Sequence, residues 1–432
     1  MRLLRYWATS LSGNEHVDLT RRKLLTGLGG TAAALAVPEL AAARTTQPRT
    51  TGPLVPGVAR KQDFAIADGY TYINGAYTHP MPIVAADAYR AAVQRRGSLG
   101  FPSSAPLPDA RGAFARLINA KPTEIAWLQN TSSGENLVIE ALGLNRPFDG
   151  NIVTDDLHFE GALIHLMELK KRGADIRIAK SRNGAVDIKD LERLVDRKTK
   201  LVEVSFVSMY NGFQHDLKRV CDLAHAHGAY VYADLIQGVG AVPLDVRATR
   251  LDFGATATYK WMMGDFGLAF FYVREDLIAR VLGRPHWSYN SAADAAIHLS
   301  PLDPQHPTPV TYTPGTDAAS HVQLGTTALS VAAALAVSVP YIEQLGVANI
   351  QAHRQPMLRK LQAELPRLGW IPQTPLESTS PIVTFAVKDT REVTRKIEAA
   401  RVSVRVADYW VRIAPSVYND MADVDRLLAA LT

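Results

Sequence analysis

Cysteine is almost absent from this sequence: Cys221 is the single one among 432 residues. One cysteine can form neither an intrachain disulfide nor a cluster of thiolate metal ligands, and we predict no metal site. Cys221 lies in the stretch DLKRVCDLAHAHG, on the expected apolar face of a helix. A thiol in that position usually packs as a small core residue.

The sequence also lacks a continuous basic run and internal repeats. The formal net charge is +5, and charges of both signs are interspersed along the chain. This pattern excludes the basic stripe that nucleic-acid binding requires, so we expect no nucleic-acid partner. With 47% hydrophobic and 21% charged residues, the chain is expected to fold and is long enough for two domains.

The first 43 residues have the features of an export signal. The stretch DLTRRKLLTGLGGTAAALAVPELAAAR contains the twin-arginine pair Arg21 and Arg22, a Gly/Ala/Leu run, and three alanines that match an A-x-A cleavage signal. The run is too interrupted for a membrane span of about 20 apolar residues. We therefore predict a signal peptide over residues 1–43 and a periplasmic or secreted protein, exported folded and without stable membrane insertion after cleavage. A basic leader or an uncleaved anchor is the alternative.

Strand-like and helix-like segments alternate after a linker and N-terminal arm over residues 44–80. Such alternation predicts an α/β fold with a parallel sheet covered on both faces. We expect a large domain over residues 81–330 with a seven-stranded, mainly parallel sheet, and a smaller α+β domain over residues 331–432. The predicted strands of the large domain are EIAWLQ, NIVTDD, DIRIAK, LVEVSFVS, AYVYADL, FGATATY and GLAFFYVR, and helical patterns between them include GENLVIEALGL, GALIHLMELKKRG, DIKDLERLVD and LKRVCDLAHAHG.

Chemically useful side chains follow the predicted strands, where open parallel sheets bind ligands. Asp234 follows AYVYA, Gln237 comes three residues later, and Lys260 follows FGATATY. A lysine in a partly apolar site has a lowered pKa and can form a Schiff base with an aldehyde. NTSSGEN opens a helix after EIAWLQ, and its start suits a phosphate, although Thr131 or Ser132 could be an ordinary N-cap. The set indicates an aldehyde cofactor with a phosphate and a ring nitrogen.

From TYINGAYTH to VRIAPSVYNDMADVDRLL, the sequence resembles the fold-type I pyridoxal-phosphate enzymes of aminotransferase class V. That family includes cysteine desulfurases, kynureninases and isopenicillin N epimerases. The most specific segments are VYADLIQGVGAVPLDV and LDFGATATYKWMMGDFGLAFFYVRED. Within the family, the sequence is most similar in our interpretation to the isopenicillin N epimerase and kynureninase-like branch. The resemblance implies a fold-type I transferase with pyridoxal 5'-phosphate as cofactor.

The resemblance assigns roles around the cofactor ring. It implies that Lys260 holds the cofactor, that Asp234 pairs with the pyridinium nitrogen, and that Gln237 reaches the ring hydroxyl. An ionised aspartate keeps the ring nitrogen protonated, and the protonated ring accepts electrons from the substrate α-carbon. Phe159 in DDLHFEG matches the aromatic or histidine position that stacks on the ring, with His158 as a rival and core packing as the alternative.

The resemblance also implies a phosphate site. Thr131 and Ser132 match the family's phosphate-binding pair, and Tyr259 matches a tyrosine that kynureninase-like members place before the lysine. The family's serine three residues before the lysine is Ala257 here, with Thr258 and Tyr259 as its expected replacements.

Two further segments concern the partner subunit and the substrate. Gly315 and Thr316 in YTPGTD match a segment that a partner subunit lends to the phosphate, which implies a homodimer. Arg412 in VRIAPSVYND matches the arginine that binds the α-carboxylate of a small amino-acid-like substrate. Guanidinium suits this bidentate contact better than an ammonium group does.

The sequence also departs from the family elsewhere. Cysteine desulfurases carry a nucleophilic cysteine on a loop before the arginine, whereas RVADYWVRIAP has none. On this ground we expect no desulfurase chemistry, but transamination or epimerisation of an amino acid or amino-acid-derived metabolite in the periplasm. A lyase that cleaves a C–S or C–C bond and a non-catalytic binding protein are the alternatives. Met209 also replaces the usual asparagine near the ring hydroxyl, and either Tyr210 or Asn211 could substitute for it.

Lys260 is the expected base at the substrate α-carbon. The sequence does not choose a second acid or base among His79, His158, His215, Tyr210 and Tyr289.

Overall fold

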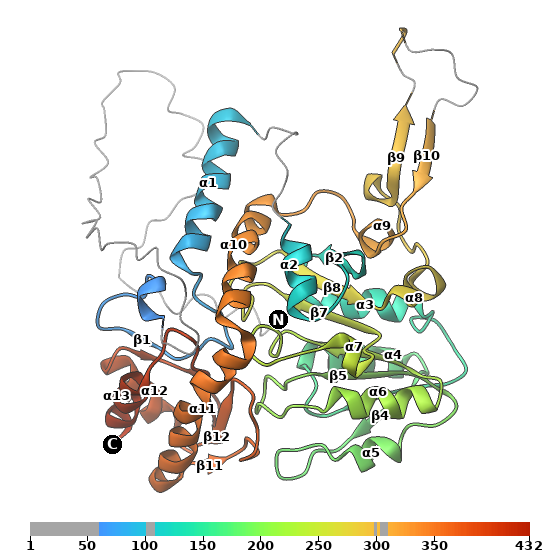
Figure 1. Ribbon diagram of the computed structural model, residues 1–432. Helices are drawn as coiled ribbons and strands as arrows, with labels where there is room; N and C mark the ends of the chain where they lie inside the picture. Colours follow the sequence, from blue (N-terminus) through green and yellow to red (C-terminus); the bar gives the residue numbers. More distant parts are fainter. Residues whose placement is uncertain (1–59, 101–108, 298–299, 303–309) are drawn as a thin grey trace, which may run out of the picture. The chain divides into compact units, whose positions relative to one another are not determined.

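The computed structural model describes residues 60–100, 109–297, 300–302 and 310–432, which belong to one unit, Pro53–Thr432 (Figure 1). The predicted signal peptide over residues 1–43 and most of the predicted linker lie outside the described residues. The domain boundaries expected near residues 80 and 330 stay predictions.

The α-helices are α1 (Ile83–Leu99), α2 (Ala110–Leu117), α3 (Thr131–Ala141), α4 (Glu160–Lys171), α5 (Ile188–Glu192), α6 (Leu217–Ala226), α7 (Val246–Thr249), α8 (Glu275–Leu277), α9 (Ala318–Val322), α10 (Leu329–Leu345), α11 (Val347–Glu364), α12 (Thr390–Ala399) and α13 (Met421–Leu431). The strands are β1 (Thr71–Tyr72), β2 (Ile125–Leu128), β3 (Asn151–Asp155), β4 (Asp175–Ala179), β5 (Thr199–Ser205), β6 (Tyr230–Asp234), β7 (Phe253–Ala257), β8 (Ala269–Val273), β9 (Ala292–Ile297), β10 (Val310–Pro314), β11 (Ile371–Pro372), β12 (Val383–Ala386), β13 (Val402–Ser403), β14 (Arg405–Ala407) and β15 (Trp410–Ile413). Short 3₁₀ segments are η2 (Lys61–Asp63), η3 (Pro122–Glu124), η5 (Tyr289–Ser291) and η6 (Leu365–Leu368), and η4 (Ile278–Leu282) is a π-helical turn.

The seven predicted strands form one sheet, which confirms the expected fold class. Its order is β2-β8-β7-β6-β5-β3-β4, and only the pairs that involve β8 are antiparallel. Because β5, β6 and β7 are parallel neighbours, their carboxyl ends meet at one edge. In this register Ser205 at the end of β5 lies opposite Asp234, and Asp234 lies opposite Ala255 of β7.

Helices cover both faces of this sheet, as the apolar character of its strands requires. On one face, alternate strand residues pack with α2, α6 and α10 into a core that contains Val231, Ala233 and Cys221. On the other face, Tyr232 and Ala255 pack with α3 and α4. The neighbouring residues 231 and 232 thus enter different cores, because side chains alternate across a strand.

The C-terminal part forms a second sheet with the order β11-β12-β15-β14, antiparallel throughout and packed against α11, α12 and α13. The N-terminal arm joins this part, because β1 pairs in parallel with β13. Further along the arm, the Gly75 amide donates to the Ala414 carbonyl at 3.0 Å and the His79 amide to the Tyr259 carbonyl at 3.0 Å. The arm therefore runs from the C-terminal sheet to the residue before Lys260.

The β9 and β10 strands form an antiparallel hairpin, drawn in gold in Figure 1. Most of its residues are exposed. Among the described residues, no single helix is both long and apolar enough to cross a membrane, and only α10 taken with residues 347–368, at a bend of 71°, meets that requirement.

Candidate active site

A cavity of about 140 Å³ opens at the carboxyl ends of β5, β6 and β7. Its wall combines hydroxyl, carboxylate, amide and amine groups with apolar side chains. The lining residues are Asn130, Thr131, Ser132, Phe159, Ser205, Val207, Met209, Asp234, Ile236, Gln237, Ala257, Tyr259 and Lys260. The cavity therefore brings together most of the residues that the sequence predicted to bind the cofactor.

Lys260 is only 9% exposed, and its amine forms no hydrogen bond or ion pair within the described residues. Its Nζ lies 5.7 Å from the centre of the Tyr259 ring. Burial, followed by the positive charge of Arg412, lowers the pKa of Lys260 to about 7, and the carboxylate of Asp234 only partly opposes this shift. A substantial fraction of the amine is then neutral near pH 7, as a nucleophile or base requires.

A tight turn after β7 places Lys260 at the wall of the cavity. The Met263 amide donates to the Lys260 carbonyl at 2.8 Å, and Met263 has a left-handed φ of 55°. Thr258 precedes this turn and is buried, and its hydroxyl donates to the carbonyls of Asp265 and Leu268 at 2.6 and 3.0 Å. The predicted phosphate contact from Thr258 therefore has no support, because its single proton is used inside the turn.

Asp234 ends β6 and is 4% exposed. Its Oδ1 accepts a hydrogen bond from the Ile236 amide at 2.9 Å, and its other oxygen has no hydrogen bond within the described residues. Burial raises the pKa of Asp234, against the hydrogen bond from Ile236 and the positive charges of His158 and Lys260. A buried carboxylate with a free oxygen at a cavity wall is suited to a cationic N–H group.

His158 lies behind the cavity wall rather than in it, so it is not the residue that stacks on the ring. Its Nδ1 is 2.8 Å from the Ser205 hydroxyl and its Nε2 is 3.4 Å from a carboxylate oxygen of Glu203, all three residues being buried. Burial lowers the pKa of His158, but the hydrogen bond to Glu203 and the nearby carboxylates produce a net increase. When it is protonated, the positive charge of His158 favours the ionised form of Asp234.

The start of α3 forms another part of the wall. Asn130 is the N-cap, since its side chain accepts from the Ser133 amide at 2.9 Å, so the alternative of an N-cap at Thr131 or Ser132 is wrong. The Thr131 hydroxyl accepts from the Ala257 amide at 3.1 Å and keeps its own proton to donate. Together with the first N–H groups of α3 and the Ser132 hydroxyl, it can bind a phosphate.

Phe159 and Gln237 both line the cavity, as predicted. The Phe159 ring lies over Gly161, where an added Cβ would come within 2.6 Å of a ring carbon. The Gln237 amide is held by two contacts: its Nε2 donates to the Ala76 carbonyl and its Oε1 accepts from the Trp261 indole, each at 3.0 Å. One N–H of Gln237 remains for a ligand.

Arg412 lies on β15 and is 3% exposed. Its Nη1 donates to the Met209 carbonyl at 2.9 Å, and its Nε is buried without a hydrogen-bond partner. Burial, aided by the positive charge of Arg405, lowers the pKa of Arg412 to about 10. Its charge also acts on Lys260, so a substrate carboxylate bound to Arg412 lies close to the amine.

The residues after Met209 do not replace the family's asparagine in the cavity. The Asn211 amide donates to the carbonyls of Gly184 and Gln373 at 2.7 and 3.1 Å, and neither Asn211 nor Tyr210 lines the cavity. Tyr210 instead stacks on Trp410, with ring centres 5.8 Å apart.

Gly315 and Thr316 do not line the cavity of their own chain. Gly315 is buried and its carbonyl accepts a hydrogen bond from Arg284, whereas Thr316 is exposed. Tyr289 shares a hydrogen bond with Thr326 at 3.0 Å and is 66% exposed. Tyr289 was one of the candidates for the second acid, but it does not line the cavity of its own chain.

His79 is a structural residue. Its Nε2 is 2.7 Å from the Ser416 hydroxyl and its Nδ1 is 2.7 Å from the Pro80 carbonyl. Burial lowers the pKa of His79 to about 4, so the imidazole is neutral near pH 7. It thus cannot act as the second acid at that pH.

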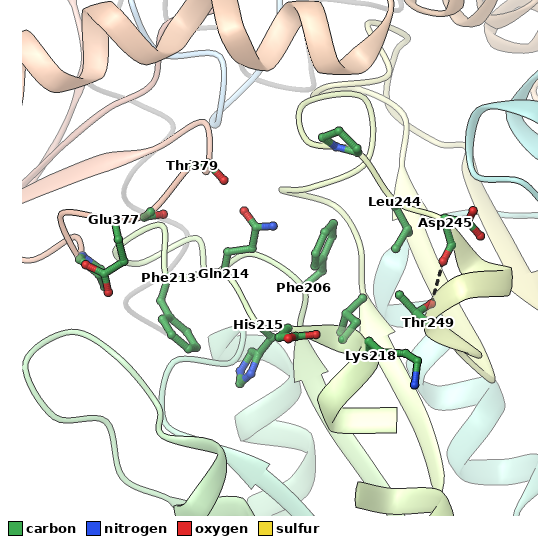
Figure 2. Close-up of a pocket in the computed structure, with 15 residues that line it drawn as sticks. Phe206, Phe213, Gln214, His215, Lys218, Leu244, Asp245, Thr249, Glu377 and Thr379 are labelled. Atoms are coloured by element: carbon green, nitrogen blue, oxygen red, sulfur yellow. Dashed lines mark hydrogen bonds between the residues drawn. The ribbon is translucent and has the colours of Figure 1, made fainter. Parts of the chain in front are cut away.

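A second cavity, of about 410 Å³, lies between the turn after β5 and the loop 375–379 (Figure 2). Its wall includes His215, whose Nε2 is 3.0 Å from the Asp155 carboxylate, and Thr249, whose hydroxyl donates to the Asp245 carbonyl at 3.0 Å. None of the predicted cofactor residues lines this second cavity. His215, a candidate for the second acid, therefore belongs to a different cavity from Lys260.

The residues of the smaller cavity fit pyridoxal phosphate. The amine of Lys260 can bind the aldehyde, the free oxygen of Asp234 can accept the ring N–H, and the start of α3 can bind the phosphate. Among the described residues, no group of three or more histidine, cysteine, aspartate or glutamate side chains could hold a metal ion. Sequence reasoning missed Ser205, although it follows the strand-end rule that identified Asp234.

The chain is similar to cysteine desulfurases along most of its length. It is 28% identical over 324 residues to a probable cysteine desulfurase of Methanothermobacter thermautotrophicus, which covers 72% of this chain and 76% of that protein. It is 25% identical over 392 residues to a cysteine desulfurase of Haloferax volcanii, which covers 83% of this chain and 88% of that protein.

Solved structures show the same fold. The apo cysteine desulfurase of Thermococcus onnurineus has a TM-score of 0.73 at 22% identity and covers 85% of this chain and 95% of its own. The cystine C–S lyase C-DES in complex with cysteine persulfide has a TM-score of 0.71 at 19% identity. The matched region covers 84% of this chain and 97% of the C-DES chain. A C-DES mutant with glycine covalently linked to its PLP cofactor has a TM-score of 0.71 at 19% identity. The matched region covers 86% of this chain and 98% of the mutant's chain.

These relatives overturn one expectation. The exclusion of cysteine desulfurase chemistry is wrong, because relatives over most of the chain are cysteine desulfurases. These relatives favour the alternative of a C–S lyase over transamination or epimerisation. The relatives also give no support to the isopenicillin N epimerase and kynureninase-like branch. The error has a physical cause: breaking a C–S bond needs a base and an electron sink at the α-carbon, while a protein cysteine is needed only to receive the sulfur. The model of the family described as Aminotransferase class-V matches residues 86–427. The chain therefore belongs to this family of pyridoxal-phosphate enzymes of fold type I.

Proposed function

We propose that this protein is a pyridoxal-phosphate-dependent lyase that cleaves the C–S bond of cysteine or of a cysteine-derived amino acid such as cystine. The observation that carries the proposal is the buried amine of Lys260, with its pKa lowered to about 7, close to Asp234 and Arg412. The names of the relatives supply the sulfur-containing substrate class.

Pyridoxal phosphate supplies, when bound, an electron sink for the negative charge that develops at the substrate α-carbon. Lys260 would hold it through the amine, Asp234 would keep its ring nitrogen protonated, and the Phe159 ring would cover one face. Thr131, Ser132 and the start of α3 would bind the phosphate.

The chain's own residues then account for the bond cleavage. Arg412 binds the substrate α-carboxylate and fixes the orientation of the α-carbon. The neutral amine of Lys260 takes the α-proton. The Cβ–S bond breaks, the electron pair leaves with the sulfur, and a Cα–Cβ double bond forms. Addition of water then releases pyruvate and ammonia, so that cystine and water yield pyruvate, ammonia and cysteine persulfide.

The chain offers no cysteine at the cavity to receive the sulfur. Cys221, the single cysteine, is buried on α6 and does not line the cavity. Burial raises the pKa of its thiol far above the usual range, which removes the nucleophilic thiolate. We propose that the sulfur leaves on the small-molecule product.

The test is a mass balance on the purified protein loaded with pyridoxal phosphate. With L-cystine or L-cysteine as substrate, we expect pyruvate, ammonia and released sulfur in equal amounts. The Cys221→Ala variant should give the same yields, because the thiol takes no part. Accumulation of a keto acid that retains its sulfur, or α-proton exchange without sulfur release, would overturn the proposal.

We further propose that the enzyme is a homodimer in which Gly315 and Thr316 face the partner's phosphate site. Large apolar side chains near this segment are exposed, including Trp287 at 58%, Tyr312 at 54% and Leu324 at 54%, as expected of an interface. Light scattering that gave the mass of a single chain at micromolar concentration would contradict a dimer.

On sequence alone, we propose that residues 1–43 direct export through the twin-arginine route. Replacing Arg21 and Arg22 by lysine should retain the protein inside the cell, and unchanged localisation on cell fractionation would contradict the proposal.

A further inference from the structure

Two acidic side chains are buried between the central sheet and the helices on one of its faces. Glu203 on β5 is completely buried, and Glu135 on α3 is 4% exposed. Within the described residues, neither is paired with a lysine or an arginine. Their partners are histidines: a carboxylate oxygen of Glu203 lies 3.4 Å from Nε2 of His158, and one of Glu135 lies 2.8 Å from Nδ1 of His165.

The two carboxylates are close enough to act on each other. The register of β5 and β6 pairs Glu203 with Tyr232, so both project from the sheet face that α3 covers. Burial raises the pKa of Glu135, the charge of Glu203 raises it further, and both carboxylates raise the pKa of Tyr232. The Oε2 of Glu203 is buried without a hydrogen-bond partner. Two buried carboxylates in this arrangement are more stable with one shared proton than with two negative charges.

His158 connects the acidic pair to the cavity. Its Nδ1 is 2.8 Å from the hydroxyl of Ser205, which lines the cavity, and its positive charge lowers the pKa of Asp234. Burial lowers the pKa of His158, and the hydrogen bond and charge of Glu203 are the first effects that oppose burial, ahead of Asp155 and Asp234. The charge next to Asp234 therefore depends on an ionised Glu203.

His165 connects the same pair to solvent. Its side chain on α4 is 23% exposed, whereas the side chains of His158 and Glu203 have no exposure. The hydrogen bond to Glu135 raises the pKa of His165 and the charge of Glu203 adds to the increase, while burial and the charge of Arg172 oppose it. A proton can reach Glu135 from solvent through this imidazole.

We infer that Glu135 carries a proton that it shares with Glu203, and that Glu203 is a positioning residue that keeps His158 cationic behind Asp234. The shared proton removes the repulsion between the two carboxylates, while the remaining negative charge faces His158. The pair thereby fixes the charge at the end of the cavity where Asp234 would meet the cofactor's ring nitrogen. The inference does not rest on the proposed C–S cleavage, because it concerns only the chain's own protons.

Infrared spectroscopy tests the shared proton in the purified full-length protein, with and without pyridoxal phosphate. At pH 7 the wild-type protein should show the C=O stretching band of a protonated carboxylic acid. Labelling the glutamate carboxyl groups with ¹³C should shift this band, which distinguishes glutamate from aspartate. Glu135→Gln should abolish the band. These measurements need no variant of Glu203, so they stand even if such a variant does not fold.

Histidine-selective ¹⁵N labelling and NMR measure the titration of His158 in the same samples. Glu135→Gln replaces a protonated acid by a neutral amide of similar shape, so the midpoint of His158 should change little. Glu203→Gln removes the ionised partner and should move the midpoint down by about one pH unit or more. Glu203→Asp keeps the charge and should restore part of the shift. The exposed Glu192 is the matched control, and Glu192→Gln should change neither readout.

Two results would overturn the inference. One is a wild-type protein without a glutamic-acid band that depends on Glu135. The other is an equal fall of the His158 midpoint in Glu135→Gln and Glu203→Gln, which would mean that both residues only support packing. Neither readout involves sulfur, so a failure of the proposed reaction would leave both unchanged.

Discussion

At the inner end of the cavity, the carboxylate of Asp234 partly offsets the charges of Lys260 and His158. Beside the cavity, at a place that we call its outer end, Arg412 donates to the carbonyl of the lining residue Met209 and lies opposite Arg405. Neither arginine is bonded to a carboxylate among the described residues. Positive and negative charges thus nearly balance at the inner end, which suits a cofactor that stays bound. The outer end is balanced only when an anionic substrate arrives, which is suited to a ligand that comes and goes.

Of the substitutions at the two ends, we expect the largest loss of activity from one at the inner end. Lys260→Ala should lower the rate of C–S cleavage by at least about 10²- to 10⁴-fold, because one change removes both the base and the attachment point. The rate of pyruvate release measures the loss. Lys218→Ala serves as control, since Lys218 is exposed and paired with Asp222, and it should keep wild-type turnover. A Lys260→Ala protein with undiminished turnover would refute the assignment.

The lowered pKa gives the same lysine a distinct pH dependence. Only the neutral amine attacks an aldehyde, and the pKa of Lys260 is lowered to about 7, so the amine is protonated below that pH and neutral above it. Reductive coupling of pyridoxal phosphate to the apoprotein should therefore increase between about pH 6 and 8 and then level off. An ordinary lysine would continue to gain reactivity up to about pH 10. Peptide mass spectrometry should locate the adduct at position 260.

A smaller effect is expected for Asp234→Asn, which keeps the shape of the side chain and the acceptor for the Ile236 amide. Asparagine cannot hold the ring nitrogen in its protonated form, so kcat should fall by about 10²- to 10³-fold with little change in KM. The variant should still bind the cofactor covalently at Lys260. Equal losses in KM and kcat would instead indicate that Asp234 supports the fold of the site.

The inner end could be predicted from the sequence because parallel strands bring their carboxyl ends to one edge. Asp234 and Lys260 follow predicted strands, and the structure places both at the cavity wall. Ser205 obeys the same rule but was missed, because β5 ends at Ser205 while the apolar stretch continues to Ser208. Thr258 was misjudged because the turn after β7, with its left-handed Met263, directs the hydroxyl inward.

The outer end could not be predicted in the same way, because the sequence pattern of a strand does not give its register against its neighbour. Arg405 faces Arg412 only in the observed register of β14 against β15, and a slip of one residue would move it to the other face. The exclusion of desulfurase chemistry failed for a different reason. The absence of a cysteine in RVADYWVRIAP describes where the sulfur does not go, and it says nothing about whether the C–S bond breaks.

The smallest effect is expected at the outer end, from Arg412→Lys. The variant keeps the positive charge but loses the planar fork that binds a carboxylate through two bonds, so KM should rise about 10- to 100-fold while kcat changes less. Steady-state kinetics with cystine measure both constants, and covalent cofactor binding should be unchanged. A fall in kcat with constant KM would contradict a role at the substrate carboxylate.

Arg412→Gln separates the charge of this residue from its shape. The positive charge of Arg412 lowers the pKa of Lys260, so its removal should raise that pKa above about 7. The amine then stays protonated to a higher pH, and the midpoint for reductive coupling of the cofactor should move upward. Arg412→Lys keeps the charge and should leave the midpoint in place. If both variants moved the midpoint equally, packing around Arg412 rather than its charge would tune Lys260, and the two ends of the cavity would not be electrostatically coupled.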